Sequence, residues 1–280
     1  MKFSVLMSIY QKEKSEHLDV CLESISNQTL LPNEIVLVED GPLTKELNHI
    51  IQKWKEKIKI IKSIKLEHNS GFAIALNAGL KACSHNIIAR MDTDDFCVHE
   101  RFEKQISYFK EHSEIDILGS HIAEYDETFE KMLHYHYFPL THKKIYKYGK
   151  LRNPFHHATV VFKKSVILEL NGYPDKLRKM QDYALWGKLL ASGFITANYD
   201  DILVKVRAGD QLYKRRRGLE YIRYEIQTLK YMKDVGYLNF FEYLFNLSFK
   251  TIVRILPISF IKIIYEKLLR QKKVLVQRTK

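Results

Sequence analysis

Features that mark disulfide-rich, zinc-binding or membrane-spanning proteins are scarce in this sequence of 280 residues. Its three cysteines, Cys21, Cys83 and Cys97, lie far apart and form no C-x-x-C pair. An odd and scattered count argues against a disulfide framework or a structural zinc site and favours a reducing compartment. Four charged residues between positions 242 and 262 interrupt the longest apolar stretch, which therefore falls short of the ~18 uncharged residues that a membrane span needs.

Familiar nucleotide-binding and targeting signatures are also missing. The chain has no G-x-G-x-x-G fingerprint, no P-loop and no internal repeat, which argues against the commonest dinucleotide and triphosphate sites. The apolar run Phe3–Tyr10 is short and is followed by charged residues, not by a small-residue cleavage site. It therefore predicts a buried first strand rather than a secretory signal, and we expect a cytoplasmic protein.

The positive charge of the chain is concentrated at one end. The formal net charge is +12, yet residues 211–280 contain 16 Lys and Arg against 5 Asp and Glu, whereas residues 1–210 contain 29 against 28. A near-neutral body with a basic, aromatic-rich tail indicates an anionic membrane surface as a partner, rather than nucleic acid.

The basic tail has the pattern of amphipathic helices that lie in a membrane interface. Basic and apolar side chains alternate beyond residue 255, and Pro257 should divide the tail into two helices. We expect residues 211–280 to form a basic helical extension at the inner face of the cell membrane. The alternative is that these helices pack on the rest of the protein. An apolar helical face is predicted from Tyr237, Phe240, Phe241, Leu244, Phe245 and Leu247.

Short β-rich runs alternate with helical patterns through the first 120 residues. Such alternation predicts an α/β fold with a mostly parallel sheet and helices on both faces. Ligands of such sheets bind at the carboxyl ends of the strands. The helices follow from apolar residues spaced three and four apart near positions 18–25, 76–83 and 102–109. The predicted strands are Phe3–Ile9, Glu34–Glu39, Ile58–Ile64, Asn86–Met91 and Ile115–Gly119. Between 120 and 210 the pattern is looser, and it predicts strands at Thr159–Phe162 and Ile202–Val206 and a helix at Asp182–Ser192.

The strongest chemical signal is a group of three carboxylates within four residues, Asp92-Thr93-Asp94-Asp95. They directly follow an apolar strand, and carboxylates this close repel one another unless a cation, hydrogen-bond donors or water compensate. Mg²⁺ and Mn²⁺ prefer oxygen ligands and are commonly held by one or two carboxylates together with substrate phosphates. A divalent-metal site is one interpretation, and an acidic surface turn that caps a helix is the other.

Three other positions have two interpretations each. Gly71 permits a tight loop before a helix whose N-terminus could face phosphate or hydroxyl groups, or which is simply an ordinary helix-starting loop. Glu39 or Asp40 could accept a hydrogen bond from a pyrimidine base, or belong to a plain Asp-Gly turn. Asp182, at a predicted helix start, is either a catalytic carboxylate or a helix N-cap.

The order and spacing of these segments resemble those of family 2 glycosyltransferases, which have the GT-A fold. The resemblance covers about residues 1–210. It rests on the E-D-G of residues 39–41, the N-S-G-x-A-x-A-x-N-x-G of residues 69–79, the R-M-D-T-D-D of residues 90–95, and residues 152–157, 171–174 and 181–186. Residues 38–44 and the basic C-terminus are most similar to bacterial enzymes that build O-antigen, capsule or exopolysaccharide repeat units.

The resemblance implies an inverting enzyme that transfers a hexose, with galactose favoured, from a UDP-sugar to a polyprenyl-diphosphate-linked saccharide. Residues 1–210 would form the catalytic domain, with 1–120 binding the nucleotide and 121–210 the acceptor. Asp182 matches the catalytic base, and Gln181 stands where the family has Glu, so the pKa of Asp182 should be less elevated than in a Glu-Asp pair. Asp94 would be the main ligand of Mn²⁺ or Mg²⁺, shared with Asp92.

The resemblance also assigns residues to the donor and the acceptor. The donor site would consist of Ser8, Tyr10, Glu39, Asp40, Gly71, Asn77, Asp92 and Thr93. Contacts with the acceptor or with phosphate are expected from His156, His157, Trp186, Arg207 and Arg215–Arg217. The Q-x-x-R-W motif of processive synthases is absent, which implies a single-addition enzyme. A nucleotidyltransferase, or a noncatalytic membrane- or nucleic-acid-binding protein, remains an alternative to this interpretation.

Overall fold

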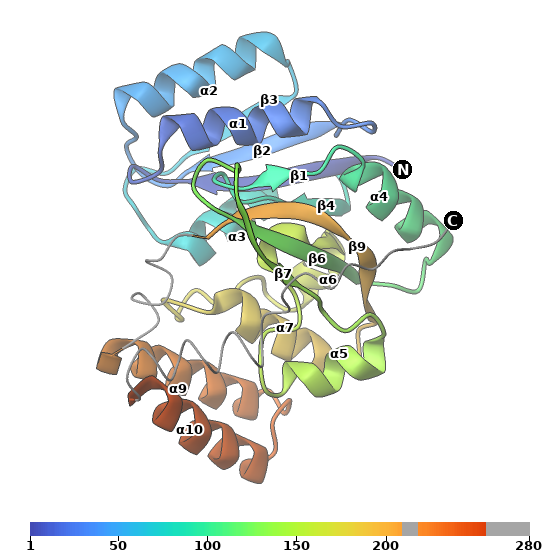
Figure 1. Cartoon of the computed structure of the whole chain (residues 1–280), viewed down its shortest axis with the longest axis vertical. Helices are drawn as coiled ribbons and strands as arrows, with labels where there is room; N and C mark the ends of the chain where they lie inside the picture. Colours follow the sequence, from blue (N-terminus) through green and yellow to red (C-terminus); the bar gives the residue numbers. More distant parts are fainter. Residues whose placement is uncertain (209–217, 256–280) are drawn as a thin grey trace.

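A nine-stranded mixed sheet forms the centre of the computed structural model, which describes residues 1–208 and 218–255 (Figure 1). The strand order is β3-β2-β1-β4-β8-β6-β9-β5, and β7 pairs with β6. The first four strands in this order are parallel, as are β6 and β9. The strands are β1 (Phe3–Ile9), β2 (Glu34–Glu39), β3 (Ile61–Lys65), β4 (Ile87–Arg90), β5 (Phe96–Cys97), β6 (Ile117–Tyr125), β7 (Met132–His136), β8 (Val161–Lys163) and β9 (Thr196–Arg207).

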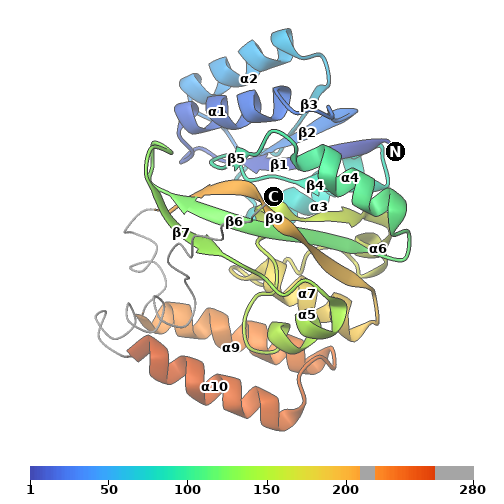
Figure 2. The same ribbon diagram turned by 45° about the vertical axis from the view of Figure 1, so that its right-hand side comes forward.

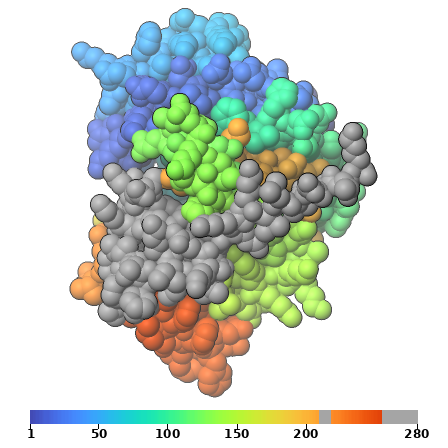
Figure 3. All heavy atoms as spheres, in the orientation of Figure 1, coloured from blue at the N-terminus to red at the C-terminus, as the bar shows by residue number. Residues whose placement is uncertain are grey.

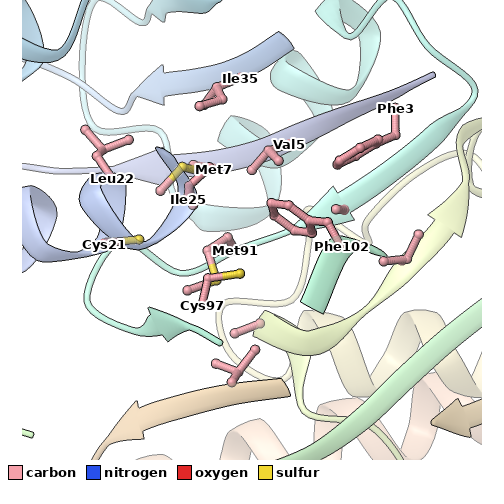
Figure 4. Close-up of a cluster of buried hydrophobic side chains, with 14 of the residues drawn as sticks. Phe3, Val5, Met7, Cys21, Leu22, Ile25, Ile35, Met91, Cys97 and Phe102 are labelled. Carbon is pink, nitrogen blue, oxygen red and sulfur yellow. The ribbon is translucent and has the colours of Figure 1, made fainter. Parts of the chain in front are cut away.

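Helices cover both faces of the sheet. One layer consists of α1 (Ser15–Ser26), α2 (Lys45–Lys57) and α4 (Arg101–Glu111). The other contains α3 (Phe72–Ala82), α5 (His142–Gly149), α6 (Lys164–Glu169), α7 (Gln181–Ala191) and α9 (Gly218–Asp234), with α10 (Phe240–Ile255) outermost against α9 (Figure 2). The alternation of β1 explains this arrangement, because successive side chains of a strand point to opposite faces. Phe3, Val5 and Met7 face the α1 and α4 layer (Figure 4), whereas Leu6 packs against α3.

Most of the predicted elements are present. The bounds of β1 and β2 match the prediction residue for residue, α7 is shifted by one residue, and the alternation within the first 120 residues gives the predicted mostly parallel sheet. The prediction of a strand from Thr159 was wrong, because residues His157–Thr159 form a 3₁₀ turn and β8 begins at Val161. The sequence interpretation did not include α2, although Thr44 caps it by accepting a hydrogen bond from the Leu47 amide at 3.2 Å. All three cysteines are buried and free, as expected.

Part of the helical extension packs against the domain that contains the sheet. Leu229 and Met232 of α9 are buried in the same core cluster as α7, and Tyr237 is buried with its hydroxyl donating to the Tyr146 carbonyl at 2.6 Å. Tyr237 therefore belongs to the core and not to an exposed apolar face, because it fills the space between α5 and α7. Within the described residues, no helix is both long and apolar enough to cross a membrane. The predictions for Arg215–Arg217 and Pro257 concern positions outside the described residues.

Candidate active site

The polar loops converge at one edge of the sheet because β1, β2 and β4 are parallel neighbours. Ile9 is paired with Glu39, and the Asp40 amide donates to the Ile9 carbonyl at 2.8 Å. Leu6 is paired with Arg90. The segments that follow these three strands therefore leave the sheet on the same side, as expected for the carboxyl ends of parallel strands. Ser8 lies at this end of β1, and Tyr10, just beyond it, is exposed.

Asp40 holds the loop that precedes α3. Its carboxylate accepts hydrogen bonds from the Ser70 amide at 2.7 Å and the Gly71 amide at 3.1 Å. Gly41 has a φ of +86°, and a Cβ there would meet the Asn69 nitrogen at 2.6 Å, so only glycine allows the two loops to lie this close. The carboxylate of Asp40 is thus occupied by the hydrogen bonds that shape the loop. The carboxylate of Glu39 is less constrained, with an ion-pair contact of 3.6 Å to Lys65 Nζ.

Asn77 ties α3 to the loop around Tyr173. Its Oδ1 accepts from the Tyr173 amide at 2.8 Å and its Nδ2 donates to the Tyr173 carbonyl at 2.9 Å. Both polar atoms of the side chain are thus occupied by the fold, in place of the donor contact expected from the sequence. The same loop contains Gly172 at a φ of +76°, where any Cβ would collide with the Asn77 amide.

A fourth carboxylate, from another loop, lies next to the three carboxylates of the acidic loop after β4. Glu13, from the loop after β1, accepts from the Thr93 hydroxyl at 3.3 Å. Burial and the negative charges of Asp92 and Glu13 raise the pKa of Asp94 to about 7. Burial and the same loop's charges raise the pKa of Asp95 well above its usual range, and its carboxylate accepts from the Arg207 amide at 3.2 Å. Asp95 therefore serves to shape the loop, whereas Asp92 and Asp94 remain partly exposed.

Arg207, at the end of β9, is half-buried, and its side chain binds to the backbone of the acidic loop. Its Nε donates to the Asp94 carbonyl at 2.7 Å, its Nη1 donates to the Glu127 carbonyl, and its guanidinium lies 4.1 Å from the centroid of the Phe129 ring. The sequence interpretation placed it among residues that grip phosphate. Because Nε and Nη1 are already engaged, its observed task is to connect the loop with the turn between β6 and β7.

The donor set of the acidic loop suits a hard divalent cation. Asp92, Asp94 and Glu13 offer only oxygen atoms. The pKa of Asp94 is raised first by burial and then by the charges of Asp92 and Glu13, a repulsion that a bound cation would relieve. Within the described residues, no three His, Cys, Asp or Glu side chains form a complete metal site. Mg²⁺ is commonly bound by one or two carboxylates, with substrate phosphates completing the shell.

Asp182 lies in the first turn of α7, across from the acidic loop. Asn153 Nδ2 donates to its Oδ2 at 2.7 Å, and Met180, the N-cap residue of α7, has a left-handed backbone with a φ of 60°. Burial raises the pKa of Asp182, with a further increase from the charge of Asp92, against lowering by hydrogen bonds from Tyr183 and Asn153 and by the charge of Arg90. An oriented carboxylate of raised pKa at an accessible helix start has the properties of a general base.

The remaining expected acceptor residues are Trp186, on α7 itself, and His156 and His157, at the 3₁₀ turn before β8. Trp186 is fully buried, and it packs near His157, whose ring centroid is 6.0 Å away. The prediction that Trp186 contacts the acceptor was therefore wrong, because its ring is enclosed by the core. Burial and the charge of Arg90 hold the pKa of His157 well below its usual range, and its Nε2 lies 2.9 Å from the Tyr173 hydroxyl. The neutral His157 is therefore part of the buried packing around α7. His156, the residue before it, is partly exposed.

Three residues of this arrangement had no assigned role in the sequence interpretation: Glu13, Arg90 and Asn153. Glu13 follows the first strand at the same edge as the acidic loop, so its position relative to β1 was a usable signal. Arg90 is a charged residue that extends the otherwise apolar strand Ile87–Arg90. Asn153 was part of a recognised segment, but its contact with Asp182 joins residues 29 positions apart and cannot be read from spacing.

The model of the family described as "Glycosyl transferase family 2" matches residues 4–168 of the chain. The chain belongs to glycosyl transferase family 2. It is 40% identical over 265 residues to the amylovoran biosynthesis glycosyltransferase AmsE of Erwinia amylovora, an alignment that covers 95% of this chain and 98% of that protein. It is 36% identical over 275 residues to an Escherichia coli UDP-Gal:α-D-GlcNAc-diphosphoundecaprenol β-1,3-galactosyltransferase, covering 96% and 97% of the two chains.

Solved structures support the same fold for this family 2 chain. Staphylococcus aureus TarS, residues 1–349, in complex with UDP-GlcNAc, matches with a TM-score of 0.67 at 18% identity, covering 90% of this chain and 72% of that one. The mannosyltransferase PcManGT of Pyrobaculum calidifontis, solved with GDP-Man and Mn²⁺, matches with a TM-score of 0.62 at 14% identity, covering 94% and 78%. The predicted GT-A fold is confirmed, and the family decides against the nucleotidyltransferase and noncatalytic alternatives.

Proposed function

We propose that this glycosyltransferase transfers a hexose, with galactose favoured, from a UDP-sugar to a lipid-diphosphate-linked saccharide during synthesis of a surface polysaccharide. The observation that carries the proposal is the combination of two features whose charges act on each other. These are the acidic loop with Asp92 and Asp94, whose oxygen atoms suit a divalent cation, and the oriented carboxylate of Asp182. The choice of donor and acceptor is supported by the galactosyltransferase to which the chain is 36% identical over nearly its full length.

In the proposed inverting reaction, an acceptor hydroxyl attacks C1 of the donor sugar from the side opposite the nucleotide. Asp182 takes the hydroxyl proton while the new C1–O bond forms and the bond from C1 to the diphosphate oxygen breaks, releasing UDP. Asn153 donates to Oδ2 of Asp182, which orients the carboxylate for the proton transfer. Such a positioned base contributes about 10²–10⁴-fold to the rate.

The donor side is proposed to bind the nucleotide through the loops after β1 and β2 and to hold Mn²⁺ or Mg²⁺ through Asp94 and Asp92. A bound divalent ion stabilises the negative charge that develops on the leaving diphosphate. The loop that Asp40 organises before α3 borders a polar cavity of about 170 Å³, which Gln181 of α7 also lines. Ser8, Tyr10, Glu39, Gly71 and Thr93 surround this side of the site in the proposal.

We also propose that the enzyme docks on the membrane through α10. Six apolar side chains of this helix are exposed, including Phe241 at 81% and Phe245 at 59%. Phe241 and Phe245 line a groove of about 640 Å³ between α5 and α10, and Lys147 and Lys150 of the α5 side line it as well. Aromatic and basic side chains on one surface are typical of interfacial helices. In Figure 3, α10 occupies the end of the molecule opposite α1 and α2. The exposed residues are Phe240, Phe241, Leu244, Phe245, Phe249 and Ile252.

A donor and acceptor screen tests the function. Purified full-length protein with Mn²⁺ is given UDP-Gal, UDP-Glc, UDP-GlcNAc, UDP-GalNAc or a GDP-sugar, together with a synthetic GlcNAc-diphosphate-lipid, and the product is identified by mass spectrometry. We expect transfer from one UDP-sugar, galactose first among them, and a loss of at least about 10²-fold in Asp182→Asn. Wild-type turnover in a folded Asp182→Asn variant would refute the assignment of the base, and transfer from GDP-sugars alone would refute the UDP assignment.

A further inference from the structure

Arg90, the last residue of β4, is a fully buried arginine that neither the proposed chemistry nor the packing of the sheet requires. Its guanidinium has 0% exposure, an ion pair of 2.5 Å from Nη1 to Asp92 Oδ1, and a position 5.1 Å from the centroid of the Phe72 ring. Its Nε and Nη2 have no hydrogen-bond acceptor in the part of the chain that the structure describes. The side chain is therefore held by charge and by an aromatic face rather than by a full set of hydrogen bonds.

Such an arrangement is costly for folding. A buried cation loses its hydration, and one ion pair with an incomplete set of hydrogen bonds offsets that loss only in part. The neighbouring β4 residues Ile87, Ile88 and Ala89 are all buried and apolar, so an apolar side chain would suit the strand at least as well. Stability alone does not explain a charge at this position, and the charge has to be explained by what surrounds it.

Arg90 lies between the two halves of the site. On the donor side it contacts Asp92. On the other side, the ring of Phe72 contacts the ring of His157, with the two centroids 5.5 Å apart. The His157 ring in turn contacts the ring of Trp186, with a centroid distance of 6.0 Å. Trp186 lies one helical turn after Asp182 on α7. The charge of Arg90 also lowers the pKa of Asp182, where burial and the charge of Asp92 raise it. Arg90 is thus in electrostatic reach of both carboxylates.

We propose that Arg90 is a positioning residue for sugar transfer, whose guanidinium fixes the carboxylate of Asp92 on the donor side and places a buried positive charge between Asp92 and Asp182. The inference rests on the proposed function, because it assigns Arg90 to the reaction that Asp92 and Asp182 serve. Arg90 is enclosed and does not touch the substrates. It acts by orienting Asp92 and by shielding the base from the negative charge of the donor side.

The test separates binding from turnover. In Arg90→Met the apolar neighbours keep a side chain of similar length, and Asp92, whose side chain is 29% exposed, regains water, so the fold should persist. Calorimetry with UDP and Mn²⁺ should give a Kd raised by about tenfold at most, because Arg90 does not touch the nucleotide but orients Asp92, a proposed metal ligand. The kcat should fall about 100-fold, the size of effect expected when reacting groups are misplaced. Arg90→Lys keeps the charge, and its kcat should be about tenfold higher than that of Arg90→Met.

Arg101 provides a matched control. It is also fully buried, but its Nη2 donates to the Arg90 carbonyl at 2.7 Å and its Nε donates to Gln105 at 2.9 Å, so its role is to hold the backbone. Arg101→Met should lower the unfolding temperature while kcat per folded molecule stays within about threefold.

The outcomes distinguish this inference from the function on which it rests. A kcat of Arg90→Met within threefold of wild type overturns the positioning role. So does a parallel loss of UDP affinity, kcat and unfolding temperature that Arg90→Lys does not relieve, since that pattern is structural. If Arg90→Met does not fold, a kcat of Arg90→Lys no higher than that of Arg90→Gln overturns the role as well. If the wild type itself transfers no sugar, the proposed function fails, and UDP binding by the variants is then the only remaining readout.

Discussion

At the scale of single residues, Asp182 combines the proposed chemistry with a cost in stability. Its folded-state pKa is raised, chiefly by burial, so the charged form needed for catalysis is disfavoured in the folded protein. The sign of the linkage follows directly. An acid whose pKa is higher in the folded than in the unfolded state binds a proton more tightly when folded, so its contribution to stability improves as the pH falls through the folded pKa and is unfavourable above it.

Asp182→Asn should therefore be inactive and also more stable than wild type at neutral pH. The gain in unfolding temperature, measured by calorimetry, should shrink as the pH is lowered through the pKa of Asp182, because the wild-type side chain then becomes neutral as well. In wild type, kcat should fall with decreasing pH at a higher pH than an ordinary aspartate would give. A variant that is less stable than wild type throughout this range would show that Asp182 stabilises the helix start instead.

At the scale of elements, α3 must lie close to the sheet for the donor loop to be in place. A Cβ on Gly79 would meet Leu6 Cδ1 and Val38 Cγ2, the latter at 2.6 Å, so the helix rests directly on β1 and β2. Gly79→Ala should destabilise the protein by about 1–2 kcal/mol, since overpacking costs about 1–3 kcal/mol and the better helix propensity returns at most about 1 kcal/mol. The KM for the donor should rise, because α3 carries the loop of residues 69–71 with it.

Gly187→Ala, on α7, is the matched change in a roomier position. Its Cβ would meet Met232 Cγ at 3.0 Å and Tyr237 Cδ1 at 3.2 Å, and the methionine side chain is flexible enough to move aside. We expect urea unfolding to show a change of less than about 1 kcal/mol for this variant. Equal losses for both variants would mean that helix displacement on the sheet is not the cause.

The elements also show how far the sequence could predict the structure. Strands such as β1 and β2 were predictable because buried parallel strands are continuous apolar runs that end in polar turns. The pairing of β6 with β9 and the short β5 depends on contacts between distant segments, with Phe96 paired to Lys205. Local pattern does not encode such pairings. For the same reason the spacing could point to the carboxylates as candidates, whereas it could not predict the hydrogen bonds by which Asn77 and Arg207 connect loops.

At the scale of the whole molecule, the apolar surface of α10 and the excess of positive charge in residues 211–280 belong to the same end of the chain. A lipid-linked acceptor has its reactive sugar close to a membrane, so an enzyme held there meets its acceptor in two dimensions. The exposed face of α10 would then serve location, and the site with Asp94 and Asp182 would serve the chemistry. This division predicts that the two can be separated by substitution.

Phe241→Glu combined with Phe245→Glu should weaken binding to vesicles of phosphatidylglycerol and phosphatidylethanolamine by about tenfold or more, because burial of each phenylalanine contributes about 1.5–3 kcal/mol when complete. The control is Leu168→Glu with Ile195→Glu, which makes the same change in two exposed apolar residues away from α10 and should leave vesicle binding unchanged. With a short-chain, water-soluble acceptor both double variants should retain wild-type kcat. With a long-chain acceptor in vesicles, only the α10 variant should lose activity. Its active site is intact, but it binds the membrane that holds the acceptor more weakly. Sedimentation of the α10 variant with vesicles at the wild-type level would show that the apolar face has another purpose.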